Sequence, residues 1–209
     1  MIENKDIEHL IKIELEKAIA AYKNSERFTE TESVFNELMN YNFDRYKRKL
    51  KKEIKRKIKR SWTNPKKGIN PELKLDAFLF EHYFPEVKDH EADIYGIIDW
   101  EEKKVDQLVI DMGYAYDFAD GLEQDPGITM QFYNPFVKNK LGKSYYKDGI
   151  LITEDTELAK CFQLKGMISI HQAFYELHNE NAFDKVHKND EFYILFGEHD
   201  DDCYLLLSI

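Results

Sequence analysis

Apolar residues recur every three or four positions through the first third of the chain, which is the spacing of helices that bury one face. The spacing predicts helices over residues 3–23, 30–62 and 71–84. Asn40-Tyr41-Asn42 interrupts the second of these helices and predicts a bend there, and Pro85 ends the third. The first third of the chain is therefore expected to be helical.

From residue 94 onward the apolar positions alternate, as they do in strands with one buried face. The alternation predicts a hairpin of residues 94–100 and 105–116, a tight hairpin around Asp148-Gly149, and a C-terminal hairpin of residues 192–196 and 203–208. Strands joined by short turns pair antiparallel. The sheet is therefore expected to be mostly antiparallel.

Helical spacing returns inside this strand-rich part, over residues 154–164 and 168–183, which predicts one or two inserted helices. Helices first, then a mostly antiparallel sheet, is an α+β arrangement, whereas a parallel α/β fold alternates strands with helices. The sequence therefore predicts an α+β fold with a C-terminal hairpin.

The length of 209 residues is typical of a single domain, and we expect one α+β domain over residues 1–209. Residues 64–70 contain Asn, Pro and Gly and have the composition of a linker. A linker there would divide the domain into a helical region, residues 1–63, and a sheet-containing region, residues 71–209.

The cysteine content and the apolar runs indicate a cytoplasmic protein. Cys161 and Cys203 are too far apart for a paired zinc motif and too few for a disulfide framework. The first residues are acidic where a signal peptide is basic, and no apolar run reaches the roughly 18 residues of a transmembrane helix. We also find no Gly-rich phosphate loop, nucleophile elbow or metal motif, so no cofactor or metal is expected and a non-catalytic role is favoured over an enzyme.

The net charge of −10 is very unevenly distributed along the chain. Residues 45–60 contain eleven Lys and Arg and one Glu, a net charge of +10, while the rest of the chain carries 19 bases and 39 acids, a net charge of −20. Such a distribution bears on partners rather than on the fold.

The basic stretch, residues 45–60, is expected to be an amphipathic helix with apolar residues on one face and bases on the other. Bases on one helix face can neutralise phosphates, which makes this stretch a candidate nucleic-acid contact. The candidate residues are Arg48, Lys52, Lys55, Arg56 and Lys59. A membrane-surface helix is another interpretation. We favour a third, in which the bases lie in solvent or near acids of the same molecule, because a body of charge −20 repels polyanions.

Acidic and aromatic residues alternate in the middle of the chain, a mixture that suits an interface with a basic partner. The candidate partner-binding residues are Trp100, Tyr116, Asp117, Asp120, Glu123 and Asp125. In the simpler alternative the aromatic residues belong to the core and the acids lie in solvent.

The segment Asp99 to Asp111 allows an enzyme hypothesis as well. Asp99, Glu101 and Lys103 loosely resemble the acid and Glu-x-Lys pattern of restriction-type nucleases, in which carboxylates hold Mg²⁺ and a lysine stabilises charge on phosphate. Here Glu101-x-Lys103 falls in a predicted turn, which cannot hold it as a strand would.

The sequence therefore leads to three ranked hypotheses. The first is a non-catalytic cytoplasmic interaction or inhibitor protein that meets a basic partner; its charge and size resemble those of bacterial toxin-neutralising immunity proteins. The second is a nucleic-acid-associated protein that uses the basic helix 45–60. The third is a metal-dependent hydrolase or nuclease around Asp99–Asp111.

Overall fold

The structure is a computed structural model that describes residues 2–63, 73–83, 91–101, 103–113, 115–147, 150–199 and 201–209. The α-helices within these residues are α1 Asn4–Lys23, α2 Phe28–Met39, α3 Phe43–Lys57, α4 Asn134–Lys138 and α5 Thr156–Asn179. A π-helical turn, Ile58–Trp62, continues α3, and a 3₁₀ turn, Gln131–Tyr133, precedes α4. The strands are β1 Leu75–His82, β2 Glu91–Ile98, β3 Val109–Ile110, β4 Asp117–Phe118, β5 Asp125–Thr129, β6 Ser144–Lys147, β7 Ile150–Thr153, β8 Lys188–Glu198 and β9 Cys203–Ser208.

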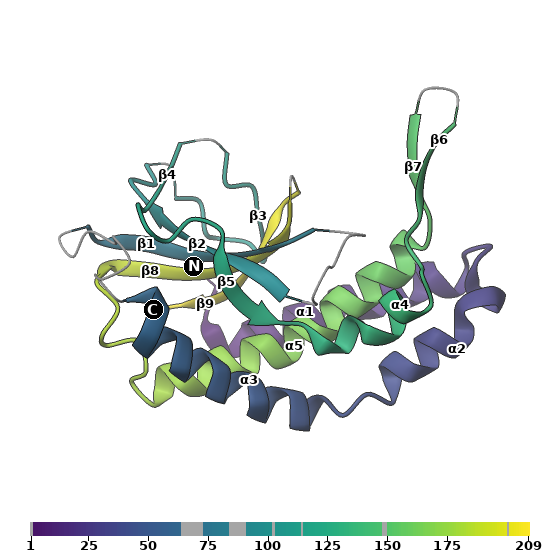
Figure 1. The fold of residues 1–209 in the computed structure, drawn as a ribbon, viewed down its shortest axis with the longest axis horizontal. Helices are drawn as coiled ribbons and strands as arrows, with labels where there is room; N and C mark the ends of the chain where they lie inside the picture. Colours follow the sequence, from purple (N-terminus) through teal and green to yellow (C-terminus); the bar gives the residue numbers. More distant parts are fainter. Residues whose placement is uncertain are drawn as a thin grey trace.

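The main sheet has the strand order β3-β9-β8-β1-β2-β4, and β5 also pairs with β2. All of its pairings are antiparallel except that of β1 with β8, which is parallel. The predicted α+β fold and the C-terminal hairpin, β8 and β9, are therefore confirmed. The predicted tight hairpin is also present, as the separate two-stranded sheet β6-β7 that projects from the molecule (Figure 1), although its turn lies outside the described residues.

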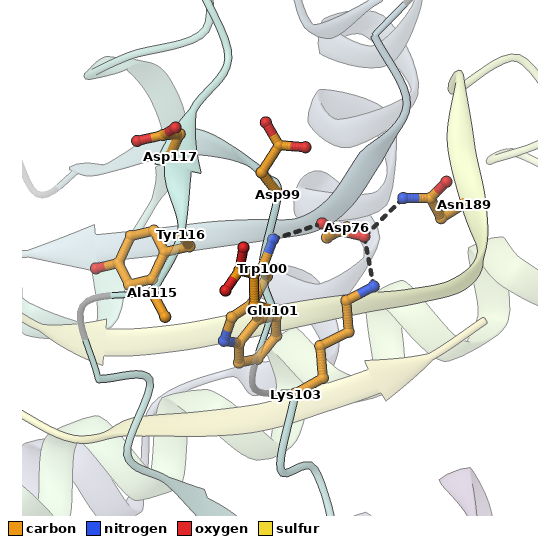
Figure 2. Close-up of a pocket in the computed structure, with 9 residues that line it drawn as sticks. All are labelled: Asp76, Asp99, Trp100, Glu101, Lys103, Ala115, Tyr116, Asp117 and Asn189. Carbon is orange, nitrogen blue, oxygen red and sulfur yellow. Dashed lines mark hydrogen bonds and ion pairs between the residues drawn. The ribbon is translucent and has the colours of Figure 1, made fainter.

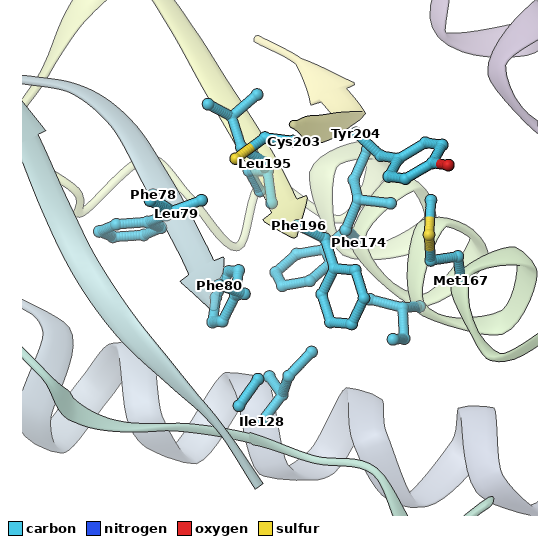
Figure 3. Packing of buried hydrophobic residues seen from close by; sticks show 14 of the residues in the cluster. Phe78, Leu79, Phe80, Ile128, Met167, Phe174, Leu195, Phe196, Cys203 and Tyr204 are labelled. Carbon is cyan, nitrogen blue, oxygen red and sulfur yellow. The ribbon is translucent and has the colours of Figure 1, made fainter. Parts of the chain in front are cut away.

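The helices lie on one side of the main sheet, and the segment that carries β3 and β4 lies on the other side (Figure 1). Aromatic side chains join the helices to the sheet. Phe80 of β1 packs against Phe174 of α5, with ring centroids 5.3 Å apart (Figure 3), and Trp62 lies 5.7 Å from Phe78. Burying such large side chains is the main stabilising contribution to this fold.

The predicted helix over residues 71–84 is wrong, because its described part is the central strand β1. The side chains from Leu75 to Phe80 are all buried, since β1 lies between β2 and β8 and is covered on both faces. A strand of this kind is a continuous apolar run, which periodicity alone cannot distinguish from a buried helix.

The predicted helix over residues 30–62 is two helices, α2 and α3, separated at the expected bend. The side chain of Asn42 accepts a hydrogen bond from the backbone N–H of Arg45 at 2.9 Å, so it caps the start of α3. The helical spacing within residues 154–183, which predicts one or two helices, corresponds to one long helix, α5.

The predicted hairpin of residues 94–100 and 105–116 is also wrong. β2 pairs with β1, β4 and β5, while β3 pairs with β9 at the other edge of the sheet. The chain after β2 thus crosses the sheet to β3 and returns to β4, and it buries Val105, Leu108 and Ile110 on the way. Alternation does not identify the partner strand, because Val109–Ile110 pairs with β9 at the far edge of the sheet and not with β2.

The helical region and the sheet contribute to one hydrophobic core, which contains residues of α1, α3, α5 and the main sheet. The division at residues 64–70 stays a prediction, since those residues lie outside the described part. No helix among the described residues has the length and apolar character needed to cross a membrane.

Candidate functional site

A pocket of about 710 Å³ opens at the end of the sheet where β1 and β8 begin and β2 ends. Its lining residues are Asp76, Asp99, Trp100, Glu101, Lys103, Ala115, Tyr116, Asp117 and Asn189. They come from four separate parts of the chain (Figure 2). We call this the acidic pocket, because four of the nine are carboxylates.

Asp76 organises the wall of the acidic pocket. Its carboxylate accepts hydrogen bonds from Lys103 Nζ at 2.5 Å, from Asn189 Nδ2 at 2.6 Å and from the backbone N–H of Trp100 at 2.9 Å. Figure 2 shows Lys103 and Asn189 turned toward this carboxylate. Burial of the Asp76 carboxyl acts to raise its pKa, but these three hydrogen bonds outweigh burial, and the pKa is lowered from its ordinary value.

The other three carboxylates of the pocket have no such role. Asp99, Glu101 and Asp117 are exposed, and within the part of the chain that the structure describes their side chains form no hydrogen bond or ion pair. Asp99 directly follows β2 and has a positive φ of 53°, a conformation that Asp tolerates better than most residues. Because Asp76 already neutralises Lys103, the pocket presents three uncompensated negative charges.

Trp100 forms part of the pocket wall but is only 2% exposed. Its ring packs edge-on against Tyr193, with centroids 6.0 Å apart. The indole Nε1 is buried, and within the described part of the chain it has no hydrogen-bond partner. A buried indole N–H usually has an acceptor, so this donor is an unusual feature beside an open pocket.

The predicted partner-binding residues are only partly brought together. Trp100, Tyr116 and Asp117 line the acidic pocket, but the other three follow β4 and do not line it. Those three are Asp120 and Glu123, which are exposed, and Asp125, which is partly buried at the start of β5.

Sequence reasoning missed three contributors to this surface. Phe118 is 40% exposed, and its ring lies 5.6 Å from that of Tyr116. Asp76 and Asn189 are brought to the pocket by the parallel pairing of β1 with β8. The one available signal was Asp76 itself, a single charged residue inside an otherwise apolar run.

The residues of the nuclease hypothesis do not form a metal site. Asp99, Glu101 and Lys103 share the pocket, but Lys103 is bound to Asp76, and Asp111 follows β3 at the other edge of the sheet. Among the described residues, no three His, Cys, Asp or Glu side chains form a group that could hold a metal ion. The geometry therefore gives this hypothesis no ligand set.

The basic helix has the predicted faces. Its apolar stripe is buried, and most of its bases are exposed. Of the candidate nucleic-acid-binding residues, Arg48, Lys52, Arg56 and Lys59 are exposed without an ion pair among the described residues, whereas Lys55 pairs with Glu180 at 2.5 Å. Some of the bases thus lie in solvent and others lie near acids of the same molecule, which is the arrangement that the favoured interpretation describes.

A second, smaller cavity of about 290 Å³ lies between the first turns of α5 and the end of β8. Glu198 lines it, and burial raises the pKa of this carboxyl to about 7, with a further rise from Asp201 and an opposing effect of Lys160. Glu198 is therefore a group that titrates near neutral pH.

No protein-family model matches the chain, and no curated protein or solved structure shows a significant similarity to it.

Proposed function

We propose that the protein is a non-catalytic cytoplasmic binding protein whose acidic pocket receives a basic segment of a partner protein. The single observation that carries this proposal is the set of three carboxylates, Asp99, Glu101 and Asp117, which line one pocket and have no ion-pair partner among the described residues. Shielding or inhibiting the partner, as immunity proteins do, is the form of activity that we expect.

The chemistry of the pocket suits lysine and arginine side chains. Carboxylates form charge-assisted hydrogen bonds with guanidinium and ammonium groups, and Tyr116 and Phe118 offer aromatic surface beside them. Trp100 is almost fully buried and forms a firm aromatic wall behind these groups. Asp120 and Glu123 lie farther along the same acidic segment and would steer the encounter.

Two further observations agree with this proposal. Cys161 and Cys203 are buried free thiols, and burial raises the pKa of each to about 12, so both are unreactive, as is usual in a reducing compartment. The Asp76 hydrogen bonds fix the pocket wall before any partner arrives, which lowers the entropic cost of binding.

The test uses a fluorescent Arg-rich peptide, with a Glu-rich peptide of equal length as the negative probe. The triple variant Asp99→Asn/Glu101→Gln/Asp117→Asn should weaken binding about tenfold or more and flatten its salt dependence, because it removes the uncompensated charges. A control variant with the same change in charge is Glu16→Gln/Glu37→Gln/Asp184→Asn, whose sites are exposed and outside the pocket. Equal losses in the two variants would show that only the overall charge matters and would contradict the proposal.

The contribution of Trp100 to the pocket wall can be tested separately with Trp100→Phe, which keeps an aromatic ring there. We expect the association rate to be unchanged and the dissociation rate to be several-fold faster, because the substitution removes short-range contact but no charge. Thermal unfolding of each variant checks that the wall is intact.

A further inference from the structure

Apart from Lys57, which pairs with Glu53 and Glu91, the bases of α3 fall into two rows with different surroundings. The inner row faces α5, where Lys47 and Lys51 lie 2.9 and 2.6 Å from the carboxylate of Glu176, and Lys51 and Lys55 lie 2.9 and 2.5 Å from that of Glu180. The pKa of Glu180 is lowered to about 2 by its hydrogen bonds to Lys55 and Lys51. The two acids at the C-terminal end of α5, Glu176 and Glu180, are therefore paired with the inner row.

The outer row has no acidic partner. It consists of Arg45, Arg48, Lys49, Lys52 and Arg56 on α3 and Lys59 on the π-helical turn. All six are exposed, and across the described ranges none of them forms an ion pair. Their spacing of three or four residues keeps them on one face over about 20 Å of helix.

The orientation of this row is fixed by the opposite face of the helix. Tyr46, Leu50 and Ile54 are buried in the core, as are Ile58 and Trp62 in the turn that follows. The Tyr46 hydroxyl also donates to the backbone oxygen of Thr129 at 2.8 Å. α3 cannot rotate without exposing this stripe, so the outer row stays directed away from the core.

We propose that the outer row of α3 is a contact surface for the phosphate backbone of nucleic acid, independent of the acidic pocket. A membrane surface fits less well, because an interfacial helix inserts its apolar face into lipid and here that face is buried in the core. A row of cations on a rigid helix suits a polyanion with regularly spaced charges, which neutralises the row and releases counterions.

A depression of about 380 Å³ supports this assignment. It is lined by six bases and one acid, namely Arg45, Arg48, Lys49, Lys51, Lys52, Lys55 and Glu180. The acid is already paired with Lys51 and Lys55, so the depression is a concave and net positive seat of the size of a few phosphate groups. α3 lies on the helix side of the sheet, whereas the segment that leads into β4 lies on the other side (Figure 1), which separates this row from the acidic pocket.

The experiment measures fluorescence anisotropy of labelled single-stranded and duplex DNA and RNA as a function of salt. The variant Arg48→Gln/Lys52→Gln/Arg56→Gln/Lys59→Gln should bind more weakly, and the slope of log K against log salt on duplex DNA should fall by about 3 to 4, since each lost phosphate contact removes about 0.9. These side chains are exposed, so circular dichroism and melting should be unchanged.

A control variant removes four other exposed lysines, Lys23, Lys143, Lys147 and Lys185, and so changes the net charge equally. It should keep the wild-type salt slope. Three results would overturn the inference: no retention of nucleic acid by the wild type at low salt, equal slopes in all three proteins, or binding to phosphatidylserine vesicles or to a Glu-rich peptide without binding to nucleic acid.

Discussion

Replacing Asp76 by Asn tests whether this buried carboxylate holds the crossing segment after β2 on the sheet. The side chain of Asp76 is 4% exposed, and its three donors belong to Trp100 and Lys103, which follow β2, and to Asn189 of β8, far along the chain. In Asp76→Asn the shape is kept and one oxygen can still accept from Trp100, but an NH₂ group replaces the acceptor of the other two donors.

The free energy of unfolding that is lost in Asp76→Asn can be estimated from these hydrogen bonds. Hydrogen bonds to charged groups contribute about 1.5–3 kcal/mol each, so losing two of them sets a range of about 3–6 kcal/mol. The side chain of Lys103 is 23% exposed and can turn toward water, which favours the lower end. We expect a loss of about 3 kcal/mol in the free energy of unfolding, or a decrease of about 6–12 °C in Tm for a chain of this length.

The assay is urea unfolding of the wild type, Asp76→Asn, Lys103→Met and the double variant, with Asp106→Asn as an exposed control. The double-mutant cycle should give a coupling of about 1–2 kcal/mol between Asp76 and Lys103, and the control should stay within about 0.5 kcal/mol of the wild type. A loss below about 1 kcal/mol, or no coupling, would refute the reasoning.

The pH dependence gives an independent check on the same group. The folded-state pKa of Asp76 is lowered, so its stabilising contribution is complete above the unfolded value of about 3.9 and is lost as the pH falls through the folded-state pKa. The difference between wild type and Asp76→Asn should therefore shrink in acid. A difference that is unchanged at about pH 2 would point to a steric effect of the amide instead.

Two further predictions concern stability. Gly166→Ala should lower the free energy of unfolding by about 1–3 kcal/mol although Ala favours helices, because a Cβ at this position of α5 would overlap the ring of Phe132. Chemical unfolding measures this loss. A gain in stability would show that Phe132 moves aside easily. Glu198→Gln should increase the free energy of unfolding by about 1 kcal/mol above pH 7, a value that allows for solvent screening of a half-buried group. The reason is that the pKa of Glu198 is raised, so the wild type loses stability as the pH rises through about 7. That gain should vanish below the ordinary glutamate pKa, and Tm measured across the pH range tests this. A gain that is the same at every pH would contradict the raised pKa of Glu198.

Local spacing was sufficient to predict the amphipathic helices and the short hairpins. In α1, Ile7, Ile11 and Leu15 are buried as their spacing predicts, and the polar residues Asp148-Gly149 marked the tight hairpin. These elements are formed by contacts between residues close in the sequence, so their signals are contained in short windows.

The central strand β1 shows where such windows fail. Its residues from Leu75 to Phe80 are buried because β1 is covered on both faces and lies between β2 and β8, and β8 follows more than a hundred residues later. The same pairing brings Asn189 to Asp76 and thereby makes the wall of the acidic pocket. A local pattern carries no information on a pairing of that range.

The sequence by itself determined that the helix of residues 45–60 is basic on one side and apolar on the other, because helix geometry converts spacing directly into faces. It could not determine which of those bases are neutralised. Which bases are neutralised depends on Glu176 and Glu180. Only the packing of α5 against α3 brings these two acids to the inner row, and the same packing leaves the outer row exposed. The interaction of charges depends on their distance and surroundings in space, and only the tertiary structure sets these.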